Sequence, residues 1–480
     1  MKKLSTIWLL PILIGSALVT SAAHTAAPSP PLRGPQHAQA LGSLFLPSSV
    51  SGATSDGSIA IDAAGVMHVA FEVYISGPVM YARCAANCTQ AASWTDVQVG
   101  SNGALGSRPI LRLTASGQLR LMYVREETGL STVPALIYNA CDANCTNPAN
   151  WTELPVIDVN TTGQGTEKSE FFALDSQGRP RAIVSSPSQT LFYITCESQC
   201  ASNAANWQAT ALTPVVGRKP ALTFDAGDRP HVAYQFTNNS VNADNDVLGY
   251  ASCDADCTDV ANWSTDGAWL LGRDFRSSFS IEVDASNRPR IAFFSSGLVV
   301  SDTAQAQKLI YTWCNISCTV GSNWAAAYVG TEAGDGIFPD LQLDANDRPH
   351  ISYINNESGY EAGYAACVAD CESAAADWRS EHLESPLSYP PAPLRPGCIQ
   401  SFWYATYPTS LALDSAGYAH IVFGARNTQN CLSTISEKFR LVRYLELGSA
   451  TDPTVTPTVT PTVTPTVTST ARQYLPFVRR

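Results

Sequence analysis

The stretch that decides the fold is Leu222-Thr223-Phe224-Asp225-Ala226-Gly227-Asp228-Arg229-Pro230-His231-Val232-Ala233-Tyr234. Apolar residues alternate up to Asp225, four turn residues follow, and the alternation then resumes, which predicts a tight β-hairpin. Asp228 stands where a type I turn with a bulge needs a left-handed backbone, which Gly, Asn and Asp tolerate. Pro230 falls on the first residue of the returning strand, where a proline does least harm.

The hairpin pattern recurs throughout the chain. Further copies run over 59–71, 111–123, 172–184, 281–293, 341–353 and 411–423. Each copy has Asp at the start of its turn except the second, which has Thr114. With its variable loop and two further strands, one unit takes about 50–70 residues, the size of a propeller blade. We therefore expect an all-β fold, a seven-bladed β-propeller of four-stranded antiparallel blades.

The seventh unit is incomplete, because no Cys pair and no Trp-containing strand follow its third strand. An extra apolar stretch, Leu41 to Leu46, instead precedes the first hairpin. We expect this N-terminal strand to complete blade seven, which closes the ring and leaves no free sheet edge there.

Twelve of the fourteen cysteines form Cys-x-x-x-Cys pairs, one in each of the first six units. A Tyr lies three residues before each pair, and a Trp lies six or seven residues after it. The pairs are Cys84 with Cys88, Cys141 with Cys145, Cys196 with Cys200, Cys253 with Cys257, Cys314 with Cys318 and Cys367 with Cys371. Zinc needs four ligands around one point and each pair offers two, so we expect disulfides rather than metal sites.

Cys398 and Cys431 stand outside this pattern. Cys398 lies in the long connection that enters the seventh unit, and Cys431 lies in the loop after its hairpin. In a propeller these two loops emerge on the same face, opposite the hairpin turns. We therefore expect a seventh disulfide between them.

The termini indicate export. Residues 1–23 combine Lys2 and Lys3, an apolar run and a small-residue cleavage site, as in a secretory signal peptide. Residues 24–40 form a Pro/Ala-rich segment that we expect to be disordered, followed by the propeller at 41–449. Residues 450–471 form a Thr/Pro/Val stalk and residues 472–480 a short tail. This ending resembles the stalk and sorting-like tail of some secreted bacterial surface proteins, which implies a secreted or cell-surface location.

The composition bears on partners and cofactors. The formal net charge is −12, and no basic cluster interrupts it, so we expect no nucleic-acid partner. Asp254, Asp256 and Asp259 lack the ligand order and closing Glu of an EF-hand, and no other pattern indicates a metal or cofactor. We expect no transmembrane segment in the mature chain, which should be a monomer.

The hairpins carry a ring of polar residues at one repeat position. These residues are His68, Arg120, Arg181, His231, Arg290, His350 and His420. Imidazole ligates metals, but recurrence in every unit favours a structural role, with each group hydrogen-bonded to the adjacent blade. Asp/Arg pairs across four of the turns, such as Asp225/Arg229, are expected to be exposed and to contribute about 0–1 kcal/mol each.

A ligand site is better sought on the face opposite the turns, where the loops differ between units. Cations beside aromatic residues would suit an acidic or neutral sugar, through carboxylate contacts and ring stacking. The predicted ligand-binding residues are Arg108, Lys168, Lys219, Arg276, Trp403, Tyr404 and Tyr407. Ordinary solvated loops are the alternative, and no residue is assigned a catalytic role.

The motif Leu-Asp-Ala-x-Gly/Asn/Asp-Arg-Pro-His-Ile-Ala-Tyr resembles that of secreted bacterial propellers of the sialidase-like (BNR-type) superfamily, over about residues 41–448. The family's Ser-x-Asp-x-Gly-x-x-Trp box is absent in that form. The resemblance implies the fold, while fold alone does not confer activity. The favoured interpretation is a non-catalytic recognition module that binds carbohydrate or a surface protein. A sialidase-like glycoside hydrolase or polysaccharide lyase, and a structural envelope protein, are the alternatives.

Overall fold

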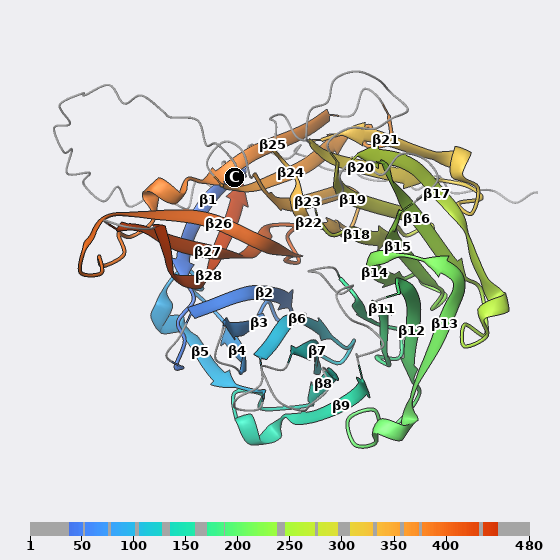
Figure 1. The fold of residues 1–480 in the computed structure, drawn as a ribbon, viewed down its shortest axis with the longest axis horizontal. Coiled ribbons are helices and arrows are strands. Elements are labelled where there is room, and N and C mark those ends of the chain that lie inside the picture. The colour runs from blue at the N-terminus through green and yellow to red at the C-terminus, as the bar shows by residue number, and fades with distance from the viewer. Residues whose placement is uncertain are drawn as a thin grey trace, which may run out of the picture. The chain divides into compact units, whose positions relative to one another are not determined.

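The computed structural model describes residues 38–449 except 51–52, 75–77, 101–104, 127–134, 159–169, 187, 238–244, 274–276, 296–307, 330–333, 356–359, 374–376 and 432–434. Twenty-eight strands form seven four-stranded antiparallel sheets, which follow one another around a ring (Figure 1). The predicted seven-bladed β-propeller is thus confirmed. The predicted signal peptide, stalk and tail lie outside the described residues. Within the described part of the chain, no helix is long and apolar enough to cross a membrane.

Each blade takes its strands in order from the centre of the ring outward. Blade 1 holds β2 (Ala53–Ile61), β3 (Met67–Tyr74), β4 (Val79–Cys84) and β5 (Trp94–Gln98), and blade 2 holds β6 (Leu105–Leu113), β7 (Leu119–Glu126), β8 (Ala135–Cys141) and β9 (Thr152–Asp158). Blade 3 holds β10 (Phe172–Leu174), β11 (Pro180–Ser185), β12 (Thr190–Cys196) and β13 (Trp207–Val216), and blade 4 holds β14 (Arg218–Phe224), β15 (Pro230–Thr237), β16 (Asn245–Cys253) and β17 (Trp263–Arg273). Blade 5 holds β18 (Ser280–Val283), β19 (Pro289–Ser295), β20 (Lys308–Cys314) and β21 (Trp324–Tyr328), and blade 6 holds β22 (Ile337–Leu343), β23 (Pro349–Ile354), β24 (Ala362–Ala369) and β25 (Asp377–Glu384). Blade 7 holds β26 (Cys398–Leu413), β27 (Ala419–Cys431), β28 (Ile435–Ser449) and, outermost, β1 (Ala38–Phe45). The 3-10 helices are η1 (Ala91–Ser93), η2 (Pro148–Asn150), η4 (Ala204–Asn206), η5 (Val260–Asn262), η6 (Gly321–Asn323) and η7 (Pro386–Ser388).

The N-terminal strand completes blade 7, as predicted. β1 pairs antiparallel with β28, with Leu44 opposite Tyr444. The seam with blade 6 is tied by Arg443 of β28, whose guanidinium donates to the Glu384 carboxylate, with 2.5 Å from Nε to Oε2. Arg443 also donates to the hydroxyl of Ser43 at 2.7 Å. One buried cation therefore links the first strand, the last strand and the preceding blade.

The hairpin turns have the predicted backbone. The third residue after the turn Asp or Thr is in the left-handed region in all seven blades, with φ between 59° and 82°. The turns of blades 3 to 5 are also hydrogen-bonded to the turn of the next blade. The side chain of the left-handed residue in the next turn accepts a backbone N–H of the preceding turn. Asp228 accepts from the Ser176 N–H at 2.6 Å, and Asp347 accepts from the Ala285 N–H at 3.0 Å.

The carboxylates of the four Asp/Arg turn pairs are buried, which corrects the expectation that these pairs are exposed. The Asp225 side chain has 0% exposure, whereas its partner Arg229 has 38%. One oxygen of Asp225 accepts the backbone N–H groups of Gly227 and Arg229, and the other accepts the Arg229 side chain. Burial favours the neutral acid, but these bonds outweigh it and hold the pKa of Asp225 below its ordinary value.

The polar ring on the returning strands is structural, but most of its bonds stay within one blade. Each histidine of the ring places Nδ1 within hydrogen-bond distance of a tyrosine hydroxyl in its own blade. The pairs are His68 with Tyr81, His231 with Tyr250, His350 with Tyr364 and His420 with Tyr444. The expectation of bonds to the adjacent blade is therefore wrong for the histidines, because the Tyr lies on the neighbouring strand of the same sheet. Arg290 does reach the next blade, with 2.5 Å from Nη2 to Glu372 Oε1.

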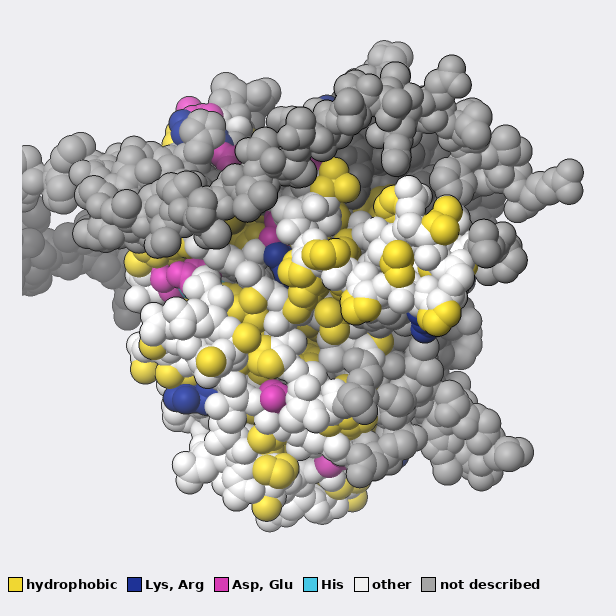
Figure 2. Space-filling model, turned by 90° about the vertical axis from the view of Figure 1, so that its left-hand side faces the viewer, with side chains coloured by type: hydrophobic (Ala, Val, Ile, Leu, Met, Phe, Trp, Pro, Cys, Tyr) yellow, Lys and Arg dark blue, Asp and Glu magenta, His cyan; other side chains and the backbone are white. Residues whose placement is uncertain are grey.

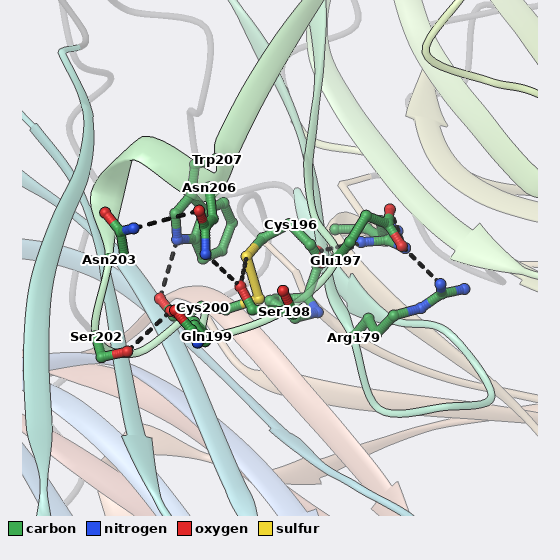
Figure 3. Close-up of a disulfide and its surroundings, with 12 residues drawn as sticks. Arg179, Cys196, Glu197, Ser198, Gln199, Cys200, Ser202, Asn203, Asn206 and Trp207 are labelled. Carbon is green, nitrogen blue, oxygen red and sulfur yellow. Dashed lines mark hydrogen bonds and ion pairs between the residues drawn. A yellow bond between two sulfur atoms is a disulfide. The ribbon is translucent and has the colours of Figure 1, made fainter.

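The same tyrosines join adjacent blades through their rings. Tyr138 of blade 2 lies with its ring centroid 5.1 Å from that of Trp207 in blade 3, and equivalent pairs follow around the ring. The Trp207 indole N–H donates to the Cys200 carbonyl at 3.0 Å (Figure 3). Each Cys loop thus positions the tryptophan that packs on the preceding blade, which explains the constant Tyr, Cys and Trp spacing.

All six predicted short-loop disulfides are present, one in each of blades 1 to 6. The first cysteine of each pair is buried in the third strand of its blade, and the second lies in the loop that follows. The bonds join Cys84 to Cys88, Cys141 to Cys145, Cys196 to Cys200, Cys253 to Cys257, Cys314 to Cys318 and Cys367 to Cys371. Figure 3 shows the bond in blade 3. These twelve cysteines are therefore structural, as predicted.

The seventh predicted disulfide is also present. Cys398 is bonded to Cys431, which sits directly opposite it where β26 pairs with β27. The two cysteines were expected in loops, but the structure places them at the ends of these two long strands. Seven disulfides are typical of proteins that work in an oxidising compartment.

Candidate functional site

The predicted ligand-binding residues are only partly covered by the structure. Lys168 and Arg276 lie outside the described residues. Arg108 and Tyr407 fall in β6 and β26, but their side chains are not described. Lys219 lies at the start of β14 with φ 51°, and it is half-buried.

Trp403 and Tyr404 are neighbours on β26 and point to opposite sides of it. Trp403 is buried, its indole N–H donates to the Pro390 carbonyl at 2.9 Å, and its ring lies 4.9 Å from that of Phe45 in β1. The Trp403 ring is therefore packed in the core of blade 7 and is not available to stack on a ligand. Tyr404 is half-buried and remains available to the surface.

Tyr404 forms part of a small surface on the face opposite the hairpin turns, here called the upper face. Its ring meets that of Tyr360 edge-on, with 5.3 Å between centroids. Tyr360 is 40% exposed and its backbone is left-handed, with φ 57°. The Arg426 guanidinium lies 5.7 Å from the Tyr404 ring, and its Nε is buried without a partner. We call Tyr360, Tyr404 and Arg426 the Tyr360 surface.

The Tyr360 surface is held firmly across the seam between blades 6 and 7. The Ala405 N–H donates to the Tyr360 carbonyl at 2.8 Å. Beside it, His382 lies between two carboxylates, with Nδ1 3.1 Å from Glu361 and Nε2 2.8 Å from Asp335. Asp335 is fully buried. Aromatic, cationic and carboxylate groups are therefore preorganised at one place.

The inner strands of the blades surround the ring axis (Figure 1), and a second polar region lies between them. In several blades the residue four positions before the turn Asp accepts a backbone N–H of the next inner strand. Ser58 accepts from Leu111 at 3.1 Å, and Ser410 accepts from Ile59 at 3.2 Å. Ser280 accepts from Leu341 at 2.9 Å. A serine hydroxyl is thus sufficient for this bond between blades.

Asp340 occupies the same position in blade 6. Its Oδ2 accepts the Leu411 N–H at 2.7 Å, as the serines do. Glu170 comes into hydrogen-bond contact with it, and two carboxyl groups can share such a contact only if one is protonated. Burial, and next the charge of Glu170, raise the pKa of Asp340 well above its usual range.

Glu282 is a further carboxyl group on which the charge of Glu170 acts. Burial, and next the charge of Glu170, raise the pKa of Glu282 to about 8. Among the described residues, Arg112 places its Nη2 3.9 Å from Glu170 Oε1. Ser280 donates to Glu170 at 2.8 Å, so the cluster also holds the serine that bonds the next blade.

Neither region resembles a metal site. No group of three or more His, Cys, Asp or Glu side chains among the described residues is arranged to hold a metal ion. Figure 2, which views the ring from one side, shows Lys and Arg side chains lying apart from one another rather than in a patch.

The sequence analysis missed Tyr360, Arg426, Glu282 and Asp340. Tyr360 and Arg426 lie where the units do not repeat, so no spacing pointed to them. Asp340 did carry a signal, because aligning the units places it with Ser58, Ser280 and Ser410. Glu282 likewise stands where other blades have Ala, Thr, Gln or Arg.

No protein-family model and no curated protein sequence matches the chain. Among solved structures, a protein of unknown function from Dyadobacter fermentans aligns with 9% identity and a TM-score of 0.44, covering 86% of this chain and 99% of that one. The K499G mutant of the NanB sialidase from Streptococcus pneumoniae aligns with 11% identity and a TM-score of 0.43, covering 88% and 71%. The polysaccharide lyase Uly1 aligns with 11% identity and a TM-score of 0.45, covering 82% and 90%. At these values the likeness says nothing about what this chain binds or catalyses.

Proposed function

We propose that this protein is an extracellular recognition module that binds carbohydrate through the Tyr360 surface on its upper face. The observation that carries the proposal is the exposed Tyr360 ring, 40% accessible and fixed edge-on against Tyr404. An exposed aromatic face stacks on the apolar face of a sugar ring. The seven disulfides support a location outside the cell.

The neighbours of Tyr360 supply the polar contacts that a sugar needs. Arg426 has a buried Nε without a partner, next to the Tyr404 ring. Glu361, directly before β24, lies 3.1 Å from Nδ1 of His382 on β25, and its carboxylate can accept from sugar hydroxyl groups. Guanidinium groups bind carboxylates in two-bond geometry, so an acidic sugar such as a uronic acid would gain a contact that a neutral sugar lacks.

The proposal does not extend to hydrolysis. Glycosidases place two carboxyl groups about 5–10 Å apart, so that the glycosidic bond fits between them. The axial pair Glu170 and Asp340 is instead in hydrogen-bond contact. That separation leaves no room for a sugar, so the pair gives the hydrolase alternative no support.

A glycan array of neutral and acidic oligosaccharides, followed by calorimetry on the best ligand, tests the proposal. Tyr360→Asn removes the ring while keeping a residue that tolerates the left-handed backbone at φ 57°. We expect a loss of affinity of about threefold to tenfold, the value of one stacking contact. Tyr418→Asn is the matched control, because Tyr418 is 36% exposed and follows a hairpin turn on the opposite face.

Two results would overturn the proposal. If Tyr360→Asn and Tyr418→Asn bind the ligand equally well, the Tyr360 surface is not the site. If no glycan binds at millimolar concentration, carbohydrate recognition itself fails, and a structural role in the envelope becomes the better explanation.

A further inference from the structure

A cleft opens between blades 2 and 3 on the face that carries the hairpin turns. Its volume is about 600 Å³, within the range of about 300–1,000 Å³ that is typical of ligand pockets. Arg120 and Asp142 line it from blade 2, and Ala201 lines it from the blade 3 Cys loop, which Figure 3 shows. We propose that this cleft binds the glutamine side chain of a peptide ligand.

The seam between blades 5 and 6 shows which kind of group such a place accepts. The Cys loops of blades 3 and 6 are one residue longer than those of the other blades, and Ala201 and Glu372 directly follow their second cysteines. Glu372 reaches back to blade 5, where Oε1 accepts from Arg290 Nη2 at 2.5 Å and Oε2 accepts from Asn315 Nδ2 at 2.7 Å. Ala201 carries no such group, so a ligand can take the corresponding place between blades 2 and 3.

Arg120 and Asp142 are the counterparts of Arg290 and Asn315 in blade 2. Both arginines stand at the same position of the returning strand, and Asn315 and Asp142 each directly follow the first cysteine. Arg290 Nη2 donates to Asn315 Oδ1 at 3.1 Å, and Arg120 Nη2 lies 2.9 Å from Asp142 Oδ1. Arg120 Nη2 also donates to Gln118 Oε1 at 3.0 Å. Within the described residues, blade 2 thus lacks only the acceptor that the next blade lends to Arg290.

The exchange of Asn for Asp decides which ligand group complements the cleft. Asn315 offers an N–H donor to the Glu372 carboxylate, whereas the second oxygen of Asp142 can only accept a hydrogen bond. A ligand carboxylate would meet a like charge there. A carboxamide can instead place its oxygen on Arg120 and its N–H on Asp142. The Asp142 side chain is 69% exposed and lines the cleft, so it is accessible to such a group.

A peptide side chain is the occupant that the fold itself exemplifies. Glutamine has the length and shape of glutamate but carries a carboxamide in place of the carboxylate, so it is the uncharged counterpart of Glu372. Around the Arg120–Asp142 pair the cleft is lined by Asn144, Asn150 and Ser202, which are polar and uncharged. Such side chains suit the neutral amide groups of a peptide backbone.

The test is calorimetry of the full-length protein with two end-blocked tripeptides, Gly-Gln-Gly and Gly-Glu-Gly. The wild type should bind the glutamine peptide about tenfold or more tighter, because the glutamate peptide exchanges a charged hydrogen bond for a like-charge contact. Asp142→Asn should reverse this order, because it recreates the Arg/Asn pair that holds Glu372 in blade 5. Loss of structure alone would weaken both peptides and would not invert the preference.

Asp254→Asn is the matched control, because Asp254 follows the first cysteine of blade 4 and is 91% exposed. It should leave both affinities unchanged. Ala201→Gln is the second variant, since it supplies the carboxamide from the chain itself, as Glu372 supplies its carboxylate in blade 6. It should abolish binding of the glutamine peptide, with a melting temperature at or above that of the wild type.

Four results would overturn the proposal. They are equal binding of the two peptides by the wild type, an unchanged preference in a folded Asp142→Asn, no binding of the glutamine peptide at millimolar concentration, and binding of N-acetylglucosamine in its place. The last result would assign the cleft to amino sugars. Tyr360→Asn should leave peptide binding unchanged, so this proposal and carbohydrate recognition through the Tyr360 surface can fail separately.

Discussion

Replacing Glu282 by Gln should make the protein more stable, and increasingly so as the pH rises. Glu282 lies on β18, two residues before the turn Asp284, and its Oε1 accepts from Gln342 of blade 6 at 3.4 Å. Blade 6 has Gln342 at the same repeat position, so the substitution introduces a residue type that the fold already accommodates there. Gln keeps the size and hydrogen-bonding capacity of Glu but cannot ionise.

The magnitude follows from the pKa of Glu282, which burial and the charge of Glu170 raise from 4.5 to about 8. At 1.36 kcal/mol per unit, the ionised side chain costs up to about 5 kcal/mol in the folded state. Glu282 is only partly buried by its accessible surface, and the solvent that reaches it reduces this cost, so we expect about 2–5 kcal/mol. The folded protein retains a proton that the unfolded chain releases between pH 4.5 and pH 8, so stability falls as pH rises through that window.

The assay is denaturant unfolding at pH 5, 6.5 and 8.5 with the disulfides intact. Burial lowers the pKa values of His68, His231 and His420, so their contribution has the opposite sign and rises with pH up to about 6.5. That contribution cancels when Glu282→Gln is compared with the wild type at each pH. The difference should be near zero at pH 5 and about 2–5 kcal/mol in favour of the variant at pH 8.5.

Asp254→Asn is the control, because the Asp254 side chain is 91% exposed. It should give the same small difference from the wild type at every pH. If the difference for Glu282→Gln is also the same at pH 5 and at pH 8.5, Glu282 is not held neutral in the folded protein.

Two further predictions concern the seams between blades. Trp207→Phe should lower the free energy of unfolding by about 1 kcal/mol more than Trp378→Phe does. The Trp207 indole N–H is bonded to the Cys200 carbonyl, whereas the buried Trp378 indole N–H has no partner. Equal losses in denaturant unfolding would contradict this prediction. Arg443→Met should cost about 3–5 kcal/mol, since it leaves Glu384 without its cation. The double variant Arg443→Met/Glu384→Gln should recover part of that loss, and a purely additive result would show that the pair is not coupled.

Much of the fold could be predicted because it depends on local chemistry that recurs in every blade. The left-handed residue of each turn restricts which amino acids can stand there, as Asp228 and Gly417 illustrate. The Cys and Trp spacing likewise reflects one short loop with one internal hydrogen bond. Blade closure by β1 followed from counting strands. These features need no knowledge of what lies across a seam.

Properties that depend on neighbours in space were predicted poorly. The sequence could not show that Asp225 would be buried while Arg229 covers it, nor that His231 would bond Tyr250 within its own blade. Tyr360 and Arg426 come from segments that differ between units, and only the folded seam brings them to the same surface. The candidate site therefore owes more to the irregular loops than to the repeat.

Some blades have a different residue at a position where the other blades share one. Such a difference changes the local energetics only when no neighbouring group replaces the lost interaction. Thr114 replaces the turn Asp of blade 2, but its hydroxyl accepts the Gln118 N–H at 3.0 Å. Arg120, which loses the usual carboxylate, pairs instead with Asp142 at 2.9 Å. Asp340 differs, because its departure from Ser brings a second buried carboxyl group into contact with Glu170. Local bonds compensate for the change in blade 2, whereas the change in blade 6 leaves two buried carboxyl groups in contact, and burial together with the charge of Glu170 raises the pKa of Asp340.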